Sequence, residues 1–322
     1  MIKLNTLFPL SFYNQEERSG YSVPVIMKEV WAVELDLLLE LKRVLDKYEL
    51  RWYAIGGTLL GAVRHGGFIP WDDDIDIAMP RVDYDRLQQI AEKEFAYPYF
   101  YQDEYSDPGV LFGHAKLRNS KTTGISSNYL EEKHGECSFN MGIFIDIFPI
   151  DNIPDDSKTA LNWEKSISDI AQLAWRFRKY THRHLPAYDG ILERQVKRLQ
   201  DEGDINMFFK MYNDALSFYY TAKTKEICLY SLYCKEKRWR FSSDDFKEVI
   251  MLPFENIEIP VPAGYEHILT QLYQDWKVLK QLPTMHSSIN GSLYDTDCSY
   301  MNYFHNGCLD RAKVRDVLAK RI

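Results

Sequence analysis

The sequence contains no run of about eighteen apolar residues, the length that a membrane-spanning helix requires. Its first twenty residues lack both an apolar stretch and a small-residue cleavage site, so we expect no signal peptide. Cysteine is scarce. The five cysteines are an odd number and show no close paired spacing in the sequence, which disfavours a disulfide framework or a zinc site. We therefore expect a cytoplasmic protein with reduced thiols and no membrane span.

An excess of positive charge is also missing. The net charge of −8 argues against general affinity for nucleic acid or for an anionic membrane surface. The hydrophobic fraction of 45% and the charged fraction of 27% are ordinary for a globular protein. Aromatic residues are frequent, at 14%, which indicates either core and edge packing or, for some of them, a cage for a cationic or ring-bearing ligand.

One stretch, residues 53–79, organises the chain. Its first apolar run ends at Gly56 and Gly57, where the backbone can turn without a clash, and Thr58 is well placed to cap a short helix over 59–64. Backbone N–H groups at such a turn and helix start form a natural cradle for phosphate. The pattern therefore predicts a phosphate-binding turn.

A cluster of carboxylates follows this turn. If residues 74–79 form a strand, Asp74 and Asp76 share one face, while Ile75 and Ile77 enter the core. Two adjacent carboxylates repel each other unless a divalent cation lies between them. Mg²⁺ (or Mn²⁺) with a phosphate-bearing substrate is the usual partner of such a pair. We therefore predict a metal site here.

A third acidic residue interrupts an apolar strand expected over residues 141–150. A carboxylate in such a run is costly to bury unless it is paired or bound to metal, so Asp146 is either a third site residue or a salt-bridged structural residue. An earlier strand, expected over 112–118, places Lys116 and Arg118 on one face. Such cations are usually solvated, but beside a metal site they can hold a diphosphate.

The turn and the acidic cluster carry a resemblance to a known family. A Gly-Gly-Thr turn followed by Asp-hydrophobic-Asp-hydrophobic looks like the signature of the nucleotidyltransferase fold. The longer string GGTLLGAVRHGGFIPWDDDIDIAMPRVDY resembles the LicD-type phosphocholine transferase family, whose relatives include the fukutin-related phosphopolyol transferases. The resemblance is strong over residues 28–154 and weaker over 245–283. Where the family has Tyr-Gly-Asp-Tyr, residues 273–276 read Tyr-Gln-Asp-Trp, so the turn at this point departs from the family.

The resemblance implies an α/β (α+β) fold, in which a nucleotidyltransferase-like mixed sheet is flanked by helices and followed by a helical middle segment. It also implies a metal-dependent phosphotransferase. The donor would be a CDP-alcohol, most simply CDP-choline, and the acceptor a hydroxyl of a cell-surface glycan or teichoic-acid precursor. The motif itself indicates only metal-assisted attack on phosphorus, and which half of the donor leaves is implied by the resemblance alone.

The expected site residues follow from the motif and the resemblance together. Asp74, Asp76 and Asp146 are predicted to be catalytic and to hold Mg²⁺ or Mn²⁺. The residues predicted to bind substrate are Gly56, Gly57, Thr58, Arg64, His65, Trp71, Lys116 and Arg118. Trp71 either forms an aromatic face for a choline head group, with Tyr129 and Phe139 near the approach to Asp146, or packs beneath its loop.

We expect three segments. Residues 1–155 form the catalytic core with an N-terminal helix over 26–48, residues 156–235 form a helical segment that is a candidate for acceptor binding, and residues 236–322 fold back on the core. The helical segment carries a basic patch that is either a solvated helix face or a contact for an anionic acceptor. The patch consists of Arg176, Arg178, Lys179, His182, Arg183 and His184.

Three other functions are compatible with the acidic motif. A nucleotidyltransferase that transfers NMP to a small molecule or protein would release pyrophosphate rather than CMP. A metal-dependent glycosyltransferase also uses Asp-x-Asp, although its usual βαβ pattern for nucleotide sugars is not evident here. A binding subunit without activity is disfavoured because all three carboxylates are present.

Overall fold

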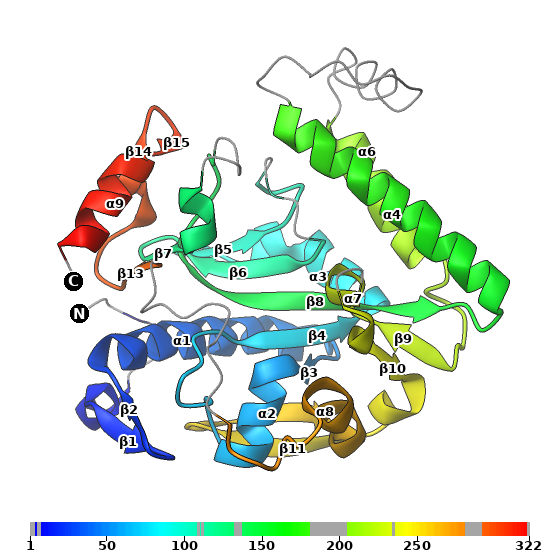
Figure 1. Ribbon diagram of the computed structural model, residues 1–322, viewed down its shortest axis with the longest axis horizontal. Helices are drawn as coiled ribbons and strands as arrows, with labels where there is room; N and C mark the ends of the chain where they lie inside the picture. The colour runs from blue at the N-terminus through cyan, green and yellow to red at the C-terminus, as the bar shows by residue number, and fades with distance from the viewer. Residues whose placement is uncertain are drawn as a thin grey trace.

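A seven-stranded mixed sheet forms the centre of the fold (Figure 1). The computed structural model describes residue 4 and the ranges 8–107, 110, 113–131, 137–180, 205–233, 236–280 and 292–320. The strands of the sheet are β3 (Tyr53–Ala54), β4 (Asp76–Pro80), β5 (Tyr99–Gln102), β6 (Ala115–Asn119), β8 (Ile143–Ile153), β9 (Glu226–Cys228) and β10 (Arg240–Ser242). Because parallel and antiparallel pairs occur together and helices flank the sheet, the predicted α/β class is confirmed.

The long strand β8 links the parts of the sheet. It runs parallel to β4 and antiparallel to both β6 and β9, and β5 and β3 extend the sheet beyond β6 and β4. Its apolar side chains are buried almost throughout, as expected for a strand with neighbours on both edges. The predicted strand over 141–150 is thus β8, displaced by two or three residues at its ends.

Helices surround this sheet (Figure 1). They are α1 (Val25–Lys47), α2 (Gly56–His65), α3 (Arg81–Glu94), α4 (Ser157–Tyr180), α6 (Ile205–Ser217), α7 (Tyr230–Tyr233), α8 (Tyr265–Tyr273) and α9 (Arg311–Ala319). The predicted helix over 26–48 is confirmed as α1. Its apolar side chains recur at helical spacing, Trp31, Leu35 and Leu38 are fully buried, and the helix packs on β8 and β6.

Four two-stranded pairs complete the described fold. They are β1 (Glu16–Arg18) with β2 (Tyr21–Val23), β11 (Val249–Phe254) with β12 (Ile257–Pro262), β7 (Thr123–Ile125) with β13 (Leu293–Asp295), and β14 (Phe304–His305) with β15 (Cys308–Leu309). The pair of β7 and β13 joins the last part of the chain to the core. The predicted basic patch falls on residues 176–184, outside the side chains that the structure describes.

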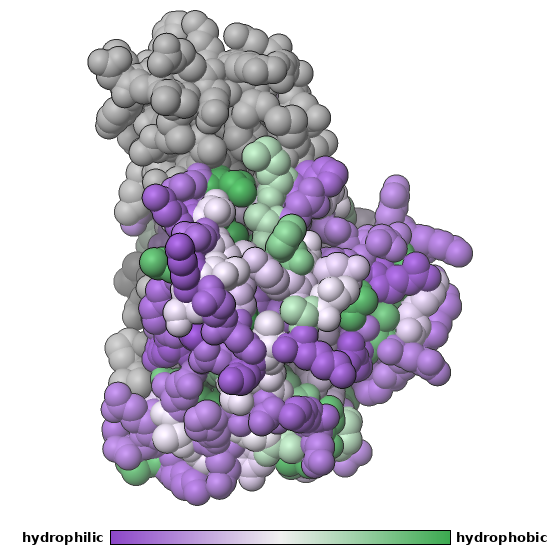
Figure 2. All heavy atoms as spheres, turned by 90° about the vertical axis from the view of Figure 1, so that its right-hand side faces the viewer, coloured by the Kyte–Doolittle hydropathy of each residue, from purple (hydrophilic) through white to green (hydrophobic). Residues whose placement is uncertain are grey.

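The helices within the described ranges were compared with the length and hydropathy that a membrane-spanning helix needs. No helix there is both long and apolar enough to span a membrane. On the face shown in Figure 2, hydrophobic side chains are interspersed with hydrophilic ones over the coloured part of the surface. The cysteines within the described ranges form no disulfide with one another.

Candidate active site

A cavity of about 430 Å³ opens where α2, the acidic run and a later part of the chain meet. Its floor and one side come from Gly56, Gly57, Leu60, Arg64, Ile69, Trp71, Asp72, Asp74 and Asp76. Its other side, called here the C-terminal wall, comes from Arg238, Trp239, Leu272, Tyr273, Gln274, Asp275, Trp276, Val278 and Lys280. Helix α8 packs beside α2, which brings this wall against the predicted turn (Figure 1).

The two glycines at the start of α2 allow carboxylates to approach the helix. A Cβ atom on Gly56 would lie 3.0 Å from an Asp76 carboxylate oxygen, and one on Gly57 would lie 2.4 Å from an Asp72 carboxylate oxygen. Gly56 also has a φ of +58°, which favours glycine. Any larger residue at Gly57 would therefore displace Asp72 from the cavity.

Thr58 does not cap the helix, and the prediction that it does so is wrong. Helix α2 begins at Gly56, three residues before the predicted start, and Ile55 is the residue that precedes it. Thr58 is instead buried, and its hydroxyl accepts a hydrogen bond of 2.8 Å from the backbone N–H of Asp76. The turn thereby fixes the first residue of β4.

Alternation of side chains in the acidic run begins before the strand itself. Strand β4 starts at Asp76 rather than at Asp74, yet Asp72, Asp74 and Asp76 all line the cavity while Asp73 and Ile75 are buried. The predicted pair of carboxylates thus faces one cavity, and Asp72 joins it. Strand β4 begins two residues later than predicted because residues 72–75 form a loop.

Two buried contacts anchor this loop from behind. The Trp31 indole N–H donates to the Asp72 carbonyl at 2.9 Å, and the Trp31 ring stacks on Phe68. The Tyr294 hydroxyl, from β13, donates to an Asp73 carboxylate oxygen at 3.3 Å. Segments from both ends of the chain therefore hold the acidic loop in place.

Asp146 lies beside Asp76 in the sheet. The two residues are register partners in the parallel pair of β4 and β8, while Lys116 on β6 is the partner of Asp146 on its other side. Lys116 forms a buried ion pair with the Asp146 carboxylate, and His114 Nε2 lies 3.1 Å from the same oxygen. Asp146 is thus adjacent to the cavity floor and already paired.

The carboxylates differ in their electrostatic surroundings. Burial, together with the charges of Asp74, Asp146 and Asp72, raises the pKa of Asp76 well above its usual range. Burial and the charges of Asp74 and Asp73 do the same for the pKa of Asp72. Although burial opposes its ionisation, Lys116 and His114 hold the pKa of Asp146 below its usual value, which makes it a weak proton acceptor.

Of the other predicted substrate-binding residues, Arg64 and Trp71 line the cavity. An Arg64 Nη donates to the Trp276 carbonyl at 2.8 Å, and no carboxylate of the described residues pairs with it. His65 lies next to it and accepts a hydrogen bond from Arg64 Nε at 3.0 Å. Burial and the charges of Arg64 and Arg18 lower the pKa of His65 to about 4. His65 therefore stays neutral near pH 7.

Lys116 and Arg118 do not line the cavity, so their placement gives no support to the predicted diphosphate contact. Lys116 is committed to Asp146, and Arg118 is fully buried, where it donates to Gln102 and, at 2.6 Å, to the Gly142 carbonyl. Tyr129 and Phe139 also lie elsewhere. Their rings meet edge to face within a separate apolar cluster that includes Leu130, Cys137 and Leu309.

The C-terminal wall is the part of the site that sequence reasoning missed. The short 3₁₀ helix η4 (Lys237–Trp239) supplies Arg238 and Trp239, and the end of α8 supplies Tyr273 and Trp276. The weak resemblance over residues 245–283 was the available signal, but it indicated no contact with the acidic motif. Packing of α8 on α2, which pattern reasoning does not predict, creates that contact.

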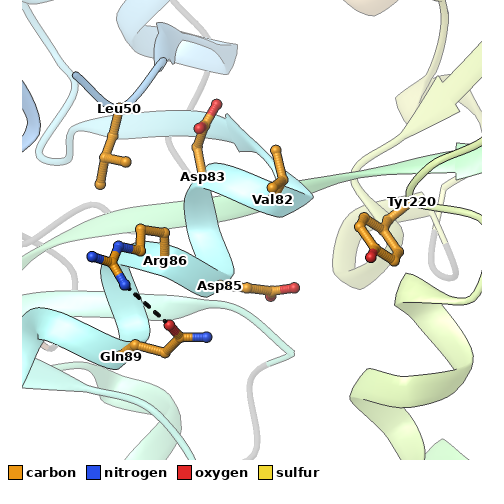
Figure 3. A pocket seen from close by; sticks show the side chains of 7 residues that line it. All are labelled: Leu50, Val82, Asp83, Asp85, Arg86, Gln89 and Tyr220. Carbon is orange, nitrogen blue, oxygen red and sulfur yellow. Dashed lines mark hydrogen bonds between the residues drawn. The ribbon is translucent and has the colours of Figure 1, made fainter. Parts of the chain in front are cut away.

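A second cavity, of about 380 Å³, lies at the outer surface of α3 (Figure 3). Several of its polar side chains form hydrogen bonds with neighbouring residues. Arg86 reaches Gln89 at 3.5 Å, and the Asp83 carboxylate accepts a hydrogen bond from Arg51 at 2.7 Å. None of the predicted site residues lines this cavity. The candidate active site is therefore the cavity above the acidic run.

A mixed sheet that presents paired carboxylates beside a Gly-Gly helix start defines a nucleotidyltransferase-type domain. Residues 49–165 match the family described as LicD/FKTN/FKRP, nucleotidyltransferase domain. Residues 49–165 therefore form a domain of this family, and the predicted class of enzyme, a phosphotransferase of the LicD type, is confirmed at this level.

Two relatives illustrate the range of the family. The chain is 28% identical over 258 residues to the lipopolysaccharide cholinephosphotransferase LicD of Haemophilus influenzae, covering 79% of this chain and 92% of that protein. It is 41% identical over 51 residues to the human ribitol 5-phosphate transferase FKRP, covering 16% of this chain and 10% of that protein. Likeness to the first therefore extends well beyond the acidic motif.

Proposed function

We propose that this protein transfers a phosphorylated alcohol, in the first place phosphocholine, from a CDP-linked donor to a hydroxyl of a cell-surface glycan or teichoic-acid precursor. The observation that carries the proposal is the cavity itself, in which Asp72, Asp74 and Asp76 face Arg64 and aromatic side chains. The likeness to a cholinephosphotransferase over most of the chain supports the choice of head group.

A divalent cation, Mg²⁺ or Mn²⁺, fits the acidic floor. Burial first, and then repulsion by neighbouring carboxylates, raises the pKa values of Asp72 and Asp76, and Lys116 offsets only part of this at Asp76. In the described ranges no three side chains form a complete metal-binding group. Mg²⁺ does not need one, since it is commonly bound through one or two carboxylates together with substrate phosphates and water. We propose Asp74 and Asp76 as those carboxylates.

A bound metal would neutralise charge that develops on the diphosphate as the bond to phosphorus breaks. The protein's own groups do the positioning. Arg64, which has no carboxylate partner among the described residues, faces the cavity and suits an anionic oxygen of the donor. Asp146 forms an ion pair with Lys116 beside the cavity floor. Because its pKa is low, Asp146 is not proposed as the group that takes a proton.

Trp71 is the candidate for the head-group contact. It lines the cavity while its ring also meets Tyr21 edge to face, at 5.9 Å between centroids, so both predicted roles remain compatible with its position. An aromatic face that contacts a desolvated quaternary ammonium contributes about 1–2 kcal/mol, roughly a tenfold preference. Tyr21→Leu is a matched control, because it removes one aromatic packing partner of Trp71 and retains the Trp71 ring.

The deciding experiment incubates the protein with Mg²⁺ and a panel of CDP-choline, CDP-glycerol, CDP-ribitol, CTP and UDP-glucose, and follows CMP release and thermal stabilisation. We expect stabilisation and CMP release with CDP-alcohols, and a selective loss of CDP-choline use in Trp71→Leu. Release of pyrophosphate from CTP alone would identify a nucleotidyltransferase. Use of UDP-glucose alone would identify a glycosyltransferase, and either result would refute the proposal.

A further inference from the structure

The turn at the end of α8 has a strained backbone. Gln274 adopts φ +55° and ψ −105°, a conformation that favours glycine. A side chain held in such a region costs about 1–3 kcal/mol and persists only where the surrounding structure imposes it. Here the Gln274 N–H donates to the Thr270 carbonyl and the Trp276 N–H donates to the Gln274 carbonyl, both at 2.8 Å. These bonds fix the turn.

The turn orients the groups on either side of it toward the acidic floor. Tyr273 precedes it and lines the cavity together with Asp72 and Asp76. Trp276 follows it, and its carbonyl accepts the hydrogen bond from Arg64. The strained residue thus stands between two groups that shape the cavity.

The side chain of Gln274 has no structural role that would explain the strain. It lines the cavity and is exposed to solvent, and its carboxamide makes no hydrogen bond to any residue that the structure describes. Glu255 and Asn306 also have positive φ, but both lie in tight hairpin turns, where that conformation is usual. Glu255 is in addition paired with Arg18. Gln274 differs from both.

We propose that Gln274 is a specificity residue whose carboxamide binds hydroxyl groups of a polyhydroxylated ligand in the cavity. This inference rests on the proposed function and deepens it. A carboxamide donates and accepts hydrogen bonds at one planar end, as neighbouring hydroxyls of a sugar or polyol require, whereas a quaternary ammonium group can do neither. The hydroxyls belong either to a polyol head group of the donor or to the acceptor sugar.

Two substitutions distinguish the contribution of the Gln274 carboxamide from that of the strained backbone. Gln274→Ala keeps the Cβ atom and hence the strain but removes the carboxamide, while Gln274→Gly removes both. Asn306→Gly, in the remote hairpin of β14 and β15, is the matched control for a glycine at positive φ. We expect Gln274→Gly to have a higher Tm than Gln274→Ala, because only glycine relieves the strain.

Ligand binding distinguishes the two sources of hydroxyls. Calorimetry with Mg²⁺ measures the affinities of CDP-glycerol and CDP-choline, and saturation-transfer NMR measures binding of methyl glucoside in the presence of CMP. If Gln274 contacts the donor, Gln274→Ala weakens CDP-glycerol about three- to tenfold and leaves CDP-choline unchanged. If it contacts the acceptor, only methyl glucoside weakens. Asn306→Gly should change neither.

Three outcomes would overturn the inference: unchanged affinity for both hydroxylated probes, equal weakening of CDP-choline, or equal Tm values for the glycine and alanine variants. Failure of the proposed function looks different. In that case the wild-type protein binds no cytidine donor, and a loss of methyl glucoside binding in Gln274→Ala would still support the role of Gln274.

Discussion

Asp76 and Asp146 are direct register partners on the parallel strands β4 and β8. The backbone N–H of Asp146 donates to the Ile75 carbonyl at 2.8 Å, and Lys116 stands opposite Asp146 on β6. Two carboxyl groups and one ammonium group therefore lie in a row across three strands. Because the backbone ladder fixes this row, the separation of the charges cannot relax without breaking the sheet.

Replacing Asp74 or Asp76 with Ala should abolish turnover, with a loss of at least about a thousandfold, while the Tm stays equal or rises. Each change removes a carboxylate that its neighbours repel, so the fold does not depend on it. CMP release and thermal unfolding check the two parts. Asp83→Asn, at the α3 cavity, is the control carboxylate and should keep full activity. Full activity of either site variant, or of the wild type in excess EDTA, would contradict the metal proposal.

Thr58→Val should destabilise the protein by about 1–3 kcal/mol, because the part-buried N–H of Asp76 loses its acceptor. Thr58→Ser retains the oxygen and should lie close to the wild type. Denaturant unfolding measures both. Equal loss in the two variants would show that the methyl group, and not the hydrogen bond, matters at this position.

Lys116→Met should destabilise the fold by about 3–5 kcal/mol, since it leaves the Asp146 charge buried with only His114 beside it. Adding Asp146→Asn should recover part of that loss, which a double-mutant cycle measures. Mg²⁺ should stabilise Lys116→Met more than the wild type if the released carboxylate can bind metal. An identical Mg²⁺ response in both proteins would argue against Asp146 as a ligand.

His65 makes stability depend on pH. Its folded pKa of about 4 lies below its ordinary value of 6.5, so the unfolded chain binds the proton more readily between these values. The contribution of neutral His65 is complete above pH 6.5 and is lost as the pH falls from 6.5 toward 4. Wild-type stability should therefore fall more steeply over this window than that of His65→Gln. Parallel curves for the two proteins would contradict the lowered pKa.

The sequence was most informative where a periodic pattern and a local motif agreed. The α1 helix follows from apolar spacing, and the alternation of Asp74 to Ile77 follows from strand geometry even though β4 begins only at Asp76. Thr58 was misassigned because its hydroxyl has two available partners. Capping rules consider only the nearby helix N–H groups, whereas the structure pairs it with the neighbouring strand.

Tertiary packing determined what the sequence could not predict. Lys116 and Arg118 alternate correctly along β6, but whether they face a substrate or a buried partner depends on β8 and β5 beside them. The C-terminal wall depends on α8 meeting α2, a contact between segments with no sequence signal for each other. The substituted glycine at Gln274 did mark an unusual turn, and the backbone there keeps a glycine-like conformation.

The floor and the wall of the cavity are encoded in separate parts of the chain. The acidic floor lies within the family match of residues 49–165, whereas every residue of the C-terminal wall falls beyond it. If the proposed transfer is correct, substitutions in the wall can change the alcohol or sugar that is bound while the phosphorus chemistry at the floor stays the same. For an engineer, this division means that a substrate library should be built on residues 238–280 over an unaltered floor.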